Sequence, residues 1–328
     1  MLLRSIPSVG PLPRAGDEGG VQDLTLHQLR VLAAVARHRS FTHAARELNL
    51  TQPAVSMQVK ALEALAGLPL LERHAREVLL TGAGKELLLH AQVALRAVDD
   101  ARDALAALRG LEAGRVDIAV VSTAKYFAPK LLSQFAKLHP GIELRLRVNN
   151  RQEVIQLLVD NAIDLALMGT PPRHLETTAF AFAKHPLVVV SAPDHPLARA
   201  RRVPVRALAE EPFLVREPGS GTRAAMERFF GAHRIRPRSE TEIASNETIK
   251  QAVMAGMGLA FISRHAIGLE VAAGQLAVLD VEGLPIVRDW NVVHRTGRRL
   301  SPGATEFKRF VLKQGRAFLA AWPAAGPR

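Results

Sequence analysis

The chain has 328 residues, which suggests two or three domains, and its 48% hydrophobic content is enough to build real cores. No apolar run reaches the roughly 18 residues that a membrane span needs, and no long apolar segment at the start predicts a signal peptide. The absence of cysteine excludes disulfides, thiolate metal sites and cysteine nucleophiles, and it fits a cytoplasmic protein.

The formal net charge of +12 favours an anionic partner. Residues 1–110 hold 13 Lys and Arg against 11 Asp and Glu, whereas the remaining 218 residues hold 30 against 20. The basic excess therefore lies in the larger, C-terminal part, where it suits DNA or an anionic small molecule. A generally Arg-rich composition is the alternative explanation.

Residues 1–23 contain Pro, Gly and charged residues without periodicity, which predicts a disordered tail. The first helix is expected over 26–38, with Thr25 as its cap. Leu29, Leu32 and Ala36 give this helix an apolar face.

Residues 40–63 are typical of a helix-turn-helix. Ser40 is a good N-cap for a helix over 41–48, and Asn49 tolerates the left-handed conformation that ends many helices. Thr51 can cap the second helix, with Pro53 in its first turn, where a missing N–H costs nothing. Two short helices joined by a tight turn form this motif.

The second helix has two faces. At 3.6 residues per turn, Val55, Val59 and Leu62 lie on one side, which is expected to pack on the preceding helices. The opposite side carries short, polar or basic side chains that suit the major groove of DNA, although a solvated face is the alternative. The DNA-contacting candidates are Thr42, Thr51, Gln52, Pro53, Ser56, Met57 and Lys60. Met57 cannot form a bidentate hydrogen bond with a base, so a thymine methyl is its expected contact.

Residues 70–80 alternate enough to predict a short hairpin with His74-Ala75-Arg76 at its tip. Beside a helix-turn-helix, such a hairpin is a wing. Arg73 and Arg76 are then candidates for contacts with the minor groove or with phosphates. The alternative is a solvated hairpin with two exposed arginines.

Thr81 can cap a long helix that ends at about Leu108. Its apolar residues recur at alternating spacings of four and three, which predicts a partner helix. A homodimer, or a homotetramer built from dimers, would pair two recognition helices on a dyad-symmetric operator. Packing on the chain's own domain is the alternative. The stripe consists of Leu87, Ala91, Ala94, Val98, Ala101, Leu105 and Leu108.

Beyond a hinge at 109–114, apolar strands alternate with helices, which predicts a largely parallel sheet covered on both faces. Strands are expected at 116–121, 142–148, 165–168, 187–190, 213–215, 241–244, 259–262 and 291–293. The expected domains are a tail (1–23), a winged helix-turn-helix (24–80), a linker helix (81–110) and an α/β domain (111–328). The α/β domain is expected to form two lobes, about 114–187 with 288–320 and about 188–287.

Polar residues follow several of these strands. In open parallel sheets, ligands bind beyond the carboxyl ends of the strands, where helix N-termini point. Hydroxyls, N–H groups and cations that meet there suit a phosphate or a carboxylate, although each residue alone could be an ordinary cap. The candidates are Ser122, Thr123, Lys125, Asn150, Arg151, Gly169, Ser220, Thr222, Arg223 and Asn246. Arg223 is the expected anchor, because its planar guanidinium matches either group.

No catalytic or metal-binding pattern stands out. The twelve histidines are scattered, and neither an HExxH nor a Gly-x-Ser-x-Gly pattern occurs. We therefore expect neither an enzyme nor a metal site, and no cofactor beyond a non-covalently bound metabolite.

The helix-turn-helix resembles the DNA-binding signature of LysR-type transcriptional regulators. The residues that carry this resemblance are Ala44-Ala45, Leu48, Gln52-Pro53-Ala54-Val55-Ser56, Gln58-Val59-Lys60 and Leu62-Glu63, followed by Leu70-Leu71-Glu72-Arg73 and Leu80-Thr81-Gly82-Ala83-Gly84. Residues 120–129 and 167–172 are similar to the Calvin-cycle (RuBisCO operon) branch of that family. The similarity covers about residues 24–320.

The resemblance implies a two-lobed effector domain like that of periplasmic binding proteins. It also implies a regulator that activates a carbon-fixation operon, binds double-stranded DNA on the nucleoid and contacts RNA polymerase. The implied effector is an anionic metabolite such as a phosphorylated sugar or a nucleotide. Two alternatives stay open: a LysR-type regulator of another pathway with an organic-acid effector, and an enzyme or solute-binding protein with a DNA-binding head.

Overall fold

The computed structural model describes residues 24–74, 77–108 and 114–322. The chain divides into two compact units, Met1–Val98 and Asp99–Arg328, with the boundary inside one long helix. Within the described residues, no helix is both long enough and apolar enough to cross a membrane.

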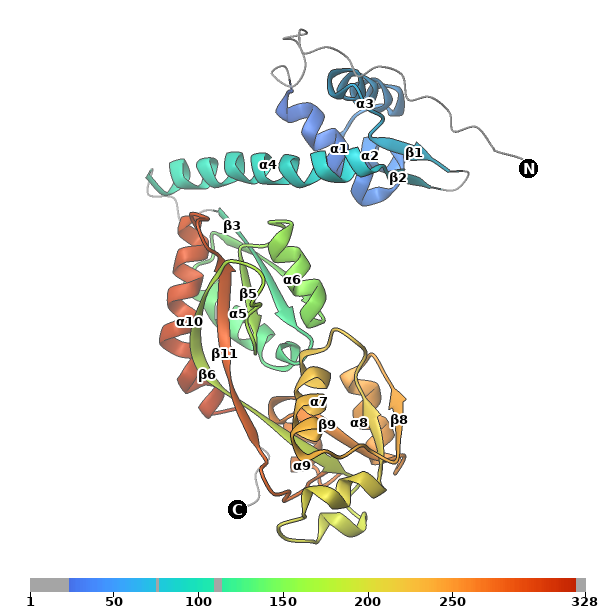
Figure 1. Cartoon of the computed structure of the whole chain (residues 1–328). Coiled ribbons are helices and arrows are strands. Elements are labelled where there is room, and N and C mark those ends of the chain that lie inside the picture. The colour runs from blue at the N-terminus through green and yellow to red at the C-terminus, as the bar shows by residue number, and fades with distance from the viewer. Residues whose placement is uncertain (1–23, 75–76, 109–113, 323–328) are drawn as a thin grey trace, which may run out of the picture. The chain divides into compact units, whose positions relative to one another are not determined.

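The N-terminal unit contains three helices, a hairpin and the start of the long helix (Figure 1). These elements are α1 (Leu26–His38), α2 (Phe41–Leu48), α3 (Gln52–Ala66), β1 (Leu71–Arg73), β2 (Val78–Leu80) and α4 (Gly82–Leu108). The side chains of Thr25, Ser40 and Thr51 cap the first three helices by accepting backbone N–H groups. Asn49 ends α2 in the left-handed conformation, with φ of 55°. The predicted helix-turn-helix, hairpin and long helix are confirmed.

The core of this unit lies under the inner face of α3. Val55, Val59 and Leu62 are 0%, 3% and 0% exposed. Val55 and Val59 pack with residues of α1 and α2, and Leu62 packs with Leu32 and Leu70. Helix α3 therefore has the predicted apolar and polar faces. Because its apolar face is buried, the residues of the opposite face point outward.

The hairpin is tied to α3 and α4 by polar contacts. The Glu63 carboxylate accepts the N–H groups of Leu70 and Leu71, at 2.9 and 3.2 Å. The Thr81 hydroxyl donates to the carbonyl of Pro69 at 2.7 Å and accepts the N–H of Gly84. A Cβ atom on Gly84 would lie 2.0 Å from the carbonyl oxygen of Leu70, so only glycine permits this close approach.

The C-terminal unit is built on one mixed nine-stranded sheet. Its strand order is β4-β3-β5-β11-β6-β9-β7-β8, with β10 paired to β6. The strands are β3 (Gly114–Val121), β4 (Ile142–Asn149), β5 (Leu165–Met168), β6 (Thr177–Ser191), β7 (Pro212–Val215), β8 (Ser239–Glu242), β9 (Leu259–Ser263), β10 (Ala277–Val278) and β11 (Ile286–Arg295). Its helices are α5 (Ala128–Leu138), α6 (Arg151–Val159), α7 (Gly221–His233), α8 (Asn246–Met254), α9 (Gly268–Ala272) and α10 (Pro302–Ala320).

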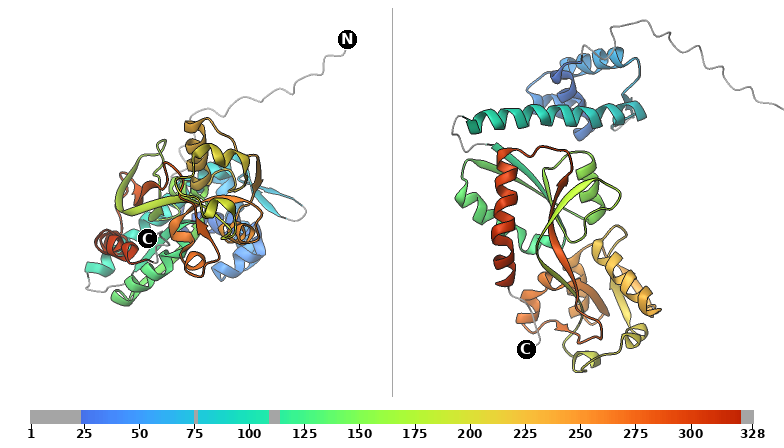
Figure 2. Two further views of the ribbon diagram at one scale, coloured as in Figure 1. Left: turned by 90° about the horizontal axis from the view of Figure 1, so that it is seen from below. Right: turned by 60° about the vertical axis from the view of Figure 1, so that its left-hand side comes forward.

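Two long strands, β6 and β11, run through both lobes of this unit, as the right-hand view of Figure 2 shows. They pair antiparallel along ten residue pairs, with one register shift at Trp290/Asn291. On one side β11 pairs with β5, and on the other side β6 pairs with β9. The first lobe therefore continues into the second through backbone hydrogen bonds.

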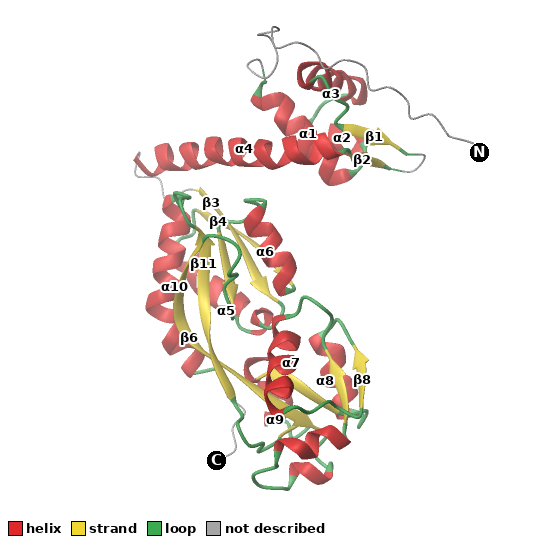
Figure 3. Ribbon diagram, in the orientation of Figure 1, coloured by secondary structure: helices red, strands yellow, loops and turns green. Residues whose placement is uncertain are grey.

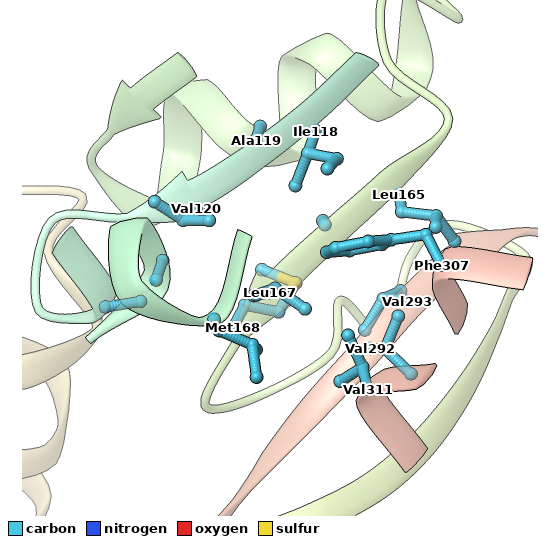
Figure 4. Close-up of a cluster of buried hydrophobic side chains, with 14 of the residues drawn as sticks. Ile118, Ala119, Val120, Leu165, Leu167, Met168, Val292, Val293, Phe307 and Val311 are labelled. Atoms are coloured by element: carbon cyan, nitrogen blue, oxygen red, sulfur yellow. The ribbon is translucent and has the colours of Figure 1, made fainter. Parts of the chain in front are cut away.

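Each lobe has its own apolar core. In the first lobe, side chains of β3, β5 and β11 pack against α10, where Phe307 is fully buried (Figure 4). In the second lobe, two clusters lie on the two faces of the sheet, one against α7 and one against α8. Helices therefore cover both faces, as Figure 3 shows, and as expected for a sheet that contains parallel strands.

Several predicted elements differ from the structure. Strand β6 begins at Thr177, ten residues before the predicted start, and most residues of its first half are partly or fully exposed, unlike the buried run at its end. Strand β8 covers 239–242 and not 241–244; all four of its residues are exposed, so no apolar signal marked it. The long antiparallel pair β6–β11 makes the sheet mixed and not largely parallel. Helix α10 was not predicted, and the hinge residues 109–113 lie outside the described residues.

We predict that Gly84→Ala destabilises the protein by about 1–3 kcal/mol, because the new methyl group would meet a backbone carbonyl and force α4 away from the hairpin. Gly82→Ala is the matched control, since a Cβ at Gly82 meets nothing within 4 Å. Thermal and urea unfolding of both variants measure the difference. Equal midpoints for the two variants would contradict the role assigned to Gly84.

Candidate functional site

The outer face of α3 is exposed and mostly polar. Gln52, Pro53, Met57 and Lys60 are exposed, and Met57 is 65% exposed although it is apolar. Ser56 is partly buried beside them. A helix that presents short polar groups near its N-terminus, followed by a cation, suits the major groove. The structure thus places these predicted residues on one surface.

Other predicted DNA-contacting residues have different surroundings. Thr42 is exposed on α2, and Thr51 uses its hydroxyl oxygen to cap α3, where it accepts the N–H of Ala54 at 3.3 Å. Arg76 and the side chain of Arg73 lie outside the described residues. Their contacts with DNA stay predictions.

Ion pairs on the surface join the end of α1 to α2. Arg37 and His38, at the end of α1, both contact the carboxylate of Glu47 on α2. Burial alone would raise the pKa of Glu47, but hydrogen bonds from His38 and Arg37 and their charges lower it overall. Arg39 extends this network to the hairpin through an ion pair of 3.2 Å with Glu77.

The predicted stripe of α4 is only partly covered within the single chain. Leu87 packs against the cluster of Leu32, Leu62 and Leu70 in the N-terminal unit. Leu105, near the other end, is 59% exposed, and Val98 between them is partly buried. The side chain of Leu108 lies outside the described residues. An apolar residue exposed to this extent on a heptad stripe is consistent with a partner helix.

A second candidate site lies between the two lobes of the C-terminal unit. Its narrow inner part, of about 20 Å³, is large enough for one water-sized group. Ends of strands and starts of helices surround it, together with two side chains from the paired long strands. The lining consists of Val121, Ser122, Thr123, Arg151, Gly169, Thr170, His185, Ser220, Gly221, Thr222 and Arg288.

The inner part opens into an outer basin of about 660 Å³. Both share Arg151, Thr170, Ser220, Gly221 and Arg288. The basin adds three more arginines and one carboxylate, namely Arg173, Arg223, Arg228 and Glu227. We call the inner part and the basin together the cleft.

Four of the cleft arginines form no ion pair with an Asp or Glu of the described residues. They are Arg151, Arg228 and Arg288, together with Arg173, which is exposed. Arg151 instead donates to the carbonyls of Thr170 and Pro171, at 3.1 and 3.3 Å. Arg288 donates to the carbonyl of Gly221 at 3.1 Å, so it joins a strand of the first lobe to a helix start of the second.

The pKa values of these groups reflect uncompensated positive charge. Burial, followed by the charges of Arg228 and Arg151, lowers the pKa of Arg288 to about 10. Burial, followed by repulsion from Arg228, also lowers the pKa of Arg151. Arg151 and Arg288 are partly buried, whereas Arg228 is exposed. Because like charges close together raise the free energy of the folded protein, an anion between them would be stabilising.

Two other arginines of this region are already paired. Arg216 is 3% exposed; it contacts both oxygens of Glu217, at 2.7 and 2.8 Å, and donates to Asn246 and Ser122. Arg223 donates to Glu227 and Glu242, at 2.8 and 2.7 Å, and these carboxylates raise its pKa. The region therefore contains two kinds of arginine: those that pair with carboxylates of the protein, and those that form no such pair among the described residues.

The structure brings six of the ten sequence-predicted residues together in the inner part: Ser122, Thr123, Arg151, Gly169, Ser220 and Thr222. Arg223, the expected anchor, lies at the basin with its charge matched by carboxylates. Lys125, Asn150 and Asn246 lie outside the described lining. Lys125 pairs with Glu247 at 3.7 Å, Asn150 caps α6, and Asn246 accepts from Arg216.

His185 and Arg288 were missed by the sequence reasoning. Both lie inside long strands, whereas the residues predicted from the sequence follow the ends of strands. They are direct cross-strand partners in the β6–β11 pair. Strand β11 also carries Asp289, Asn291, His294 and Arg295, so the charge of Arg288 did not distinguish it in the sequence.

These features define a class of DNA-binding regulator that responds to a ligand. They are a winged helix-turn-helix, a long helix and a two-lobed α/β domain with a cationic cleft. Comparison with known families agrees. Residues 26–85 match the family described as bacterial regulatory helix-turn-helix protein, lysR family, and residues 109–316 match the LysR substrate binding domain. The chain belongs to the LysR family of transcriptional regulators, which are not enzymes.

Individual relatives are also similar over most of their length. The HTH-type transcriptional regulator CbbR of Rhodospirillum rubrum is 52% identical over 291 residues, covering 89% of this chain and 97% of that protein. CfxR of Cupriavidus necator is 49% identical over 296 residues, covering 90% and 93%. The solved regulatory domain of Synechocystis PCC6803 CcmR, in complex with 2-PG, is 39% identical with a TM-score of 0.59, covering 61% of this chain and 96% of that domain.

We predict that Lys60→Ala weakens binding to all DNA sequences and lowers the salt slope by about one unit, because a phosphate contact is lost. Ser56→Ala should instead relax base specificity, at a cost of about 1–3 kcal/mol on the preferred site. Fluorescence anisotropy on the operator and on scrambled DNA at several salt concentrations measures both effects. Lys137→Ala, which removes an exposed lysine from the C-terminal unit, is the charge-matched control.

We predict that Arg228→Ala weakens the binding of small anions about tenfold, because it removes one of the cleft arginines that pair with no carboxylate of the described residues. Arg236→Ala removes an exposed arginine outside the cleft and should leave the affinity unchanged. Arg223→Ala should change it much less than Arg228→Ala, since the charge of Arg223 is already matched. Calorimetric titration with inorganic phosphate and with 2-PG measures all three. An equal loss in Arg228→Ala and Arg236→Ala would contradict the assignment.

Proposed function

We propose that the chain is a metabolite-responsive regulator of a carbon-fixation operon, which binds DNA through α3 and a small anionic effector in the cleft. Arg151, Arg228 and Arg288 are the single observation that carries the effector class. They converge on one cleft and form no ion pair with a carboxylate of the described residues, and two of them have lowered pKa values. A bound anion would relieve their mutual repulsion.

The cleft also offers neutral donors for such an anion. Ser122 accepts a hydrogen bond from Arg216, so its own hydroxyl proton is left for another acceptor. Thr123 and Thr222 are 4% exposed and line the same space, and α7 begins there at Gly221. Cations, hydroxyls and a helix N-terminus are the groups that hold phosphates and carboxylates in proteins.

The relatives support the target and the effector. Proteins about 50% identical to this chain include the regulators CbbR and CfxR. A protein of Allochromatium vinosum, which matches 89% of this chain, is called a RuBisCO operon transcriptional regulator. The similar CcmR domain binds 2-PG. We therefore propose an operon of CO₂ fixation as the target, and 2-PG or another small phosphorylated metabolite as the effector.

The proposed active form is a homodimer or a homotetramer. Two copies of α4 paired through the stripe would present two α3 helices to a dyad-symmetric operator. The proposed site of action is the nucleoid in the cytoplasm, where the bound protein would contact RNA polymerase.

The proposal is tested by footprinting the DNA upstream of the carbon-fixation genes, with and without 2-PG. The expected result is a dyad-symmetric protected region whose extent or affinity changes with 2-PG in the unaltered protein and not in Arg288→Ala. Phosphorylated sugars and an organic acid such as citrate are tested in parallel. Protection at another operon, with a response to the organic acid alone, would support the alternative regulator and reject the proposal.

We predict that Val98→Asp abolishes dimerisation, because a carboxylate in the middle of the paired stripe would be buried without a partner in both copies. Ala97→Asp adds the same charge to the same turn of α4, at an exposed position beside the stripe, and should leave the dimer intact. Sedimentation velocity gives the oligomeric state, and binding to the palindromic operator gives its consequence. A dimeric Val98→Asp protein would contradict the role of the stripe.

A further inference from the structure

The inner part of the cleft contains a histidine whose ring is held on three sides. His185 is 1% exposed. Its ring stacks on the indole of Trp290, with centroids 3.9 Å apart and planes 15° apart. Its Nε2 atom lies 3.1 Å from the hydroxyl of Ser263. The indole in turn donates from Nε1 to Nδ1 of His265, at 3.3 Å. The His185 ring is therefore fixed in plane and orientation by neighbours that do not line the inner part of the cleft.

The fourth side of the ring faces the ligand space. The Nδ1 atom of His185 is buried and has no hydrogen-bond partner among the described residues, and the same is true of Nε of Arg288. Both residues line the inner part of the cleft and are cross-strand partners. Two adjacent buried polar atoms without partners are costly unless a ligand satisfies them.

Gly169 keeps this space open. A Cβ atom at Gly169 would lie 2.8 Å from Nδ1 of His185 and 3.4 Å from Nη2 of Arg288. The backbone of Gly169 is held in place by Asn291, whose amide donates to its carbonyl at 3.2 Å. The missing side chain thus leaves a gap bordered by an imidazole nitrogen and a guanidinium.

Ser263 determines which nitrogen of His185 carries the proton. Ser263 is fully buried, and within the described residues the only hydrogen bond of its side chain is the one to His185. If His185 donated from Nε2, the proton of the serine hydroxyl would be left without an acceptor. The hydroxyl therefore donates to Nε2, which leaves the proton of a neutral imidazole on Nδ1.

The ring is neutral because its surroundings disfavour a charge. Burial lowers the pKa of His185 well below its ordinary value, and the nearby Arg288 and His265 lower it further. His265 itself is neutral, since burial and the charge of Arg264 lower its pKa to about 4. His185 therefore offers one fixed donor into the gap without adding a positive charge.

We infer that His185 determines effector specificity: its Nδ1–H, together with Nε–H of Arg288, holds an anionic oxygen of the effector in the gap beside Gly169. Ser263 is a positioning residue that sets the tautomer. This inference rests on the proposed function, since it concerns the same cleft. In this inference the unpaired arginines attract the anion. His185 then selects ligands whose acceptor group is small enough to enter the inner part of the cleft.

The test compares two amides that imitate opposite nitrogens of the imidazole. His185→Asn places an amide N–H₂ near the position of Nδ1, whereas His185→Gln places it near the position of Nε2. Affinity for 2-PG and for inorganic phosphate is measured by the fluorescence of Trp290 in a Trp322→Phe background, since the chain has two tryptophans. We expect His185→Gln to lose about tenfold or more in affinity and His185→Asn to lose much less. Equal affinities in both variants and the parent would overturn the inference.

A second measurement does not depend on the folding of these variants. In the unaltered protein labelled with ¹⁵N-histidine, the chemical shifts of His185 should show a neutral ring protonated on Nδ1, and only the Nδ1 signal should move strongly on addition of 2-PG. In Ser263→Ala the two tautomers should mix, and the affinity should fall. A ring protonated on Nε2 in the unaltered protein would reject the inference.

The proposed effector class and the inference about His185 can be rejected separately. If the unaltered protein bound neither 2-PG nor phosphate, while its melting temperature showed it folded, the proposed effector class would fail. If it bound an anion with the expected dependence on Arg228 but without any dependence on His185, only the inference about His185 would fail.

Discussion

The effector domain depends on the antiparallel pairing of β6 and β11. These strands carry the sheet from one lobe into the other, so the two lobes share backbone hydrogen bonds along ten residue pairs. The same pair places His185 opposite Arg288 at the point where β5 ends and α7 begins. The register of one ladder therefore sets both the geometry between the lobes and the position of two side chains in the cleft, because a slip of one residue would turn each of them to the other face of the sheet.

Charge distribution separates the structural part of the cleft from the part that can receive a ligand. Arg216 and Arg223 satisfy carboxylates of the same chain, so they fix the surrounding loops and offer little charge to a ligand. Arg151, Arg228 and Arg288 repel one another. Arg151 and Arg288 donate to backbone carbonyls, and Arg288 also donates to the hydroxyl of Thr170. Such a group costs stability in the folded protein, and under the proposed function a bound anion would recover that cost. Because Arg288 also contacts Gly221 of the second lobe, a change in its environment would reach both lobes.

Much of this organisation could be predicted from the sequence. Caps, turn residues and periodicity located the helix-turn-helix, the long helix and most strands, because those signals are local. The polar residues after strands were expected to meet at one end of the sheet, and Ser122, Thr123, Ser220 and Thr222 line one space there; their contact with an effector stays a prediction. The anchor could not be predicted. Arg223 and Arg288 carry the same charge, and only the fold shows that carboxylates 4 and 19 residues away already neutralise Arg223. His185 lacked a sequence signal, because its meaning comes from Gly169, Trp290 and Ser263, which are far from it in the chain.

The central claim is that the cleft is a preformed anion site whose empty state is strained by like charges. The most direct test is thermal unfolding of the unaltered protein as 2-PG or inorganic phosphate is added, each compared with sodium chloride at the same ionic strength. A ligand that binds only the folded state raises the unfolding free energy logarithmically with its concentration. The account predicts such a rise for at least one of the two anions, beyond the effect of chloride. Unfolding midpoints that follow ionic strength alone, for both anions, would contradict it.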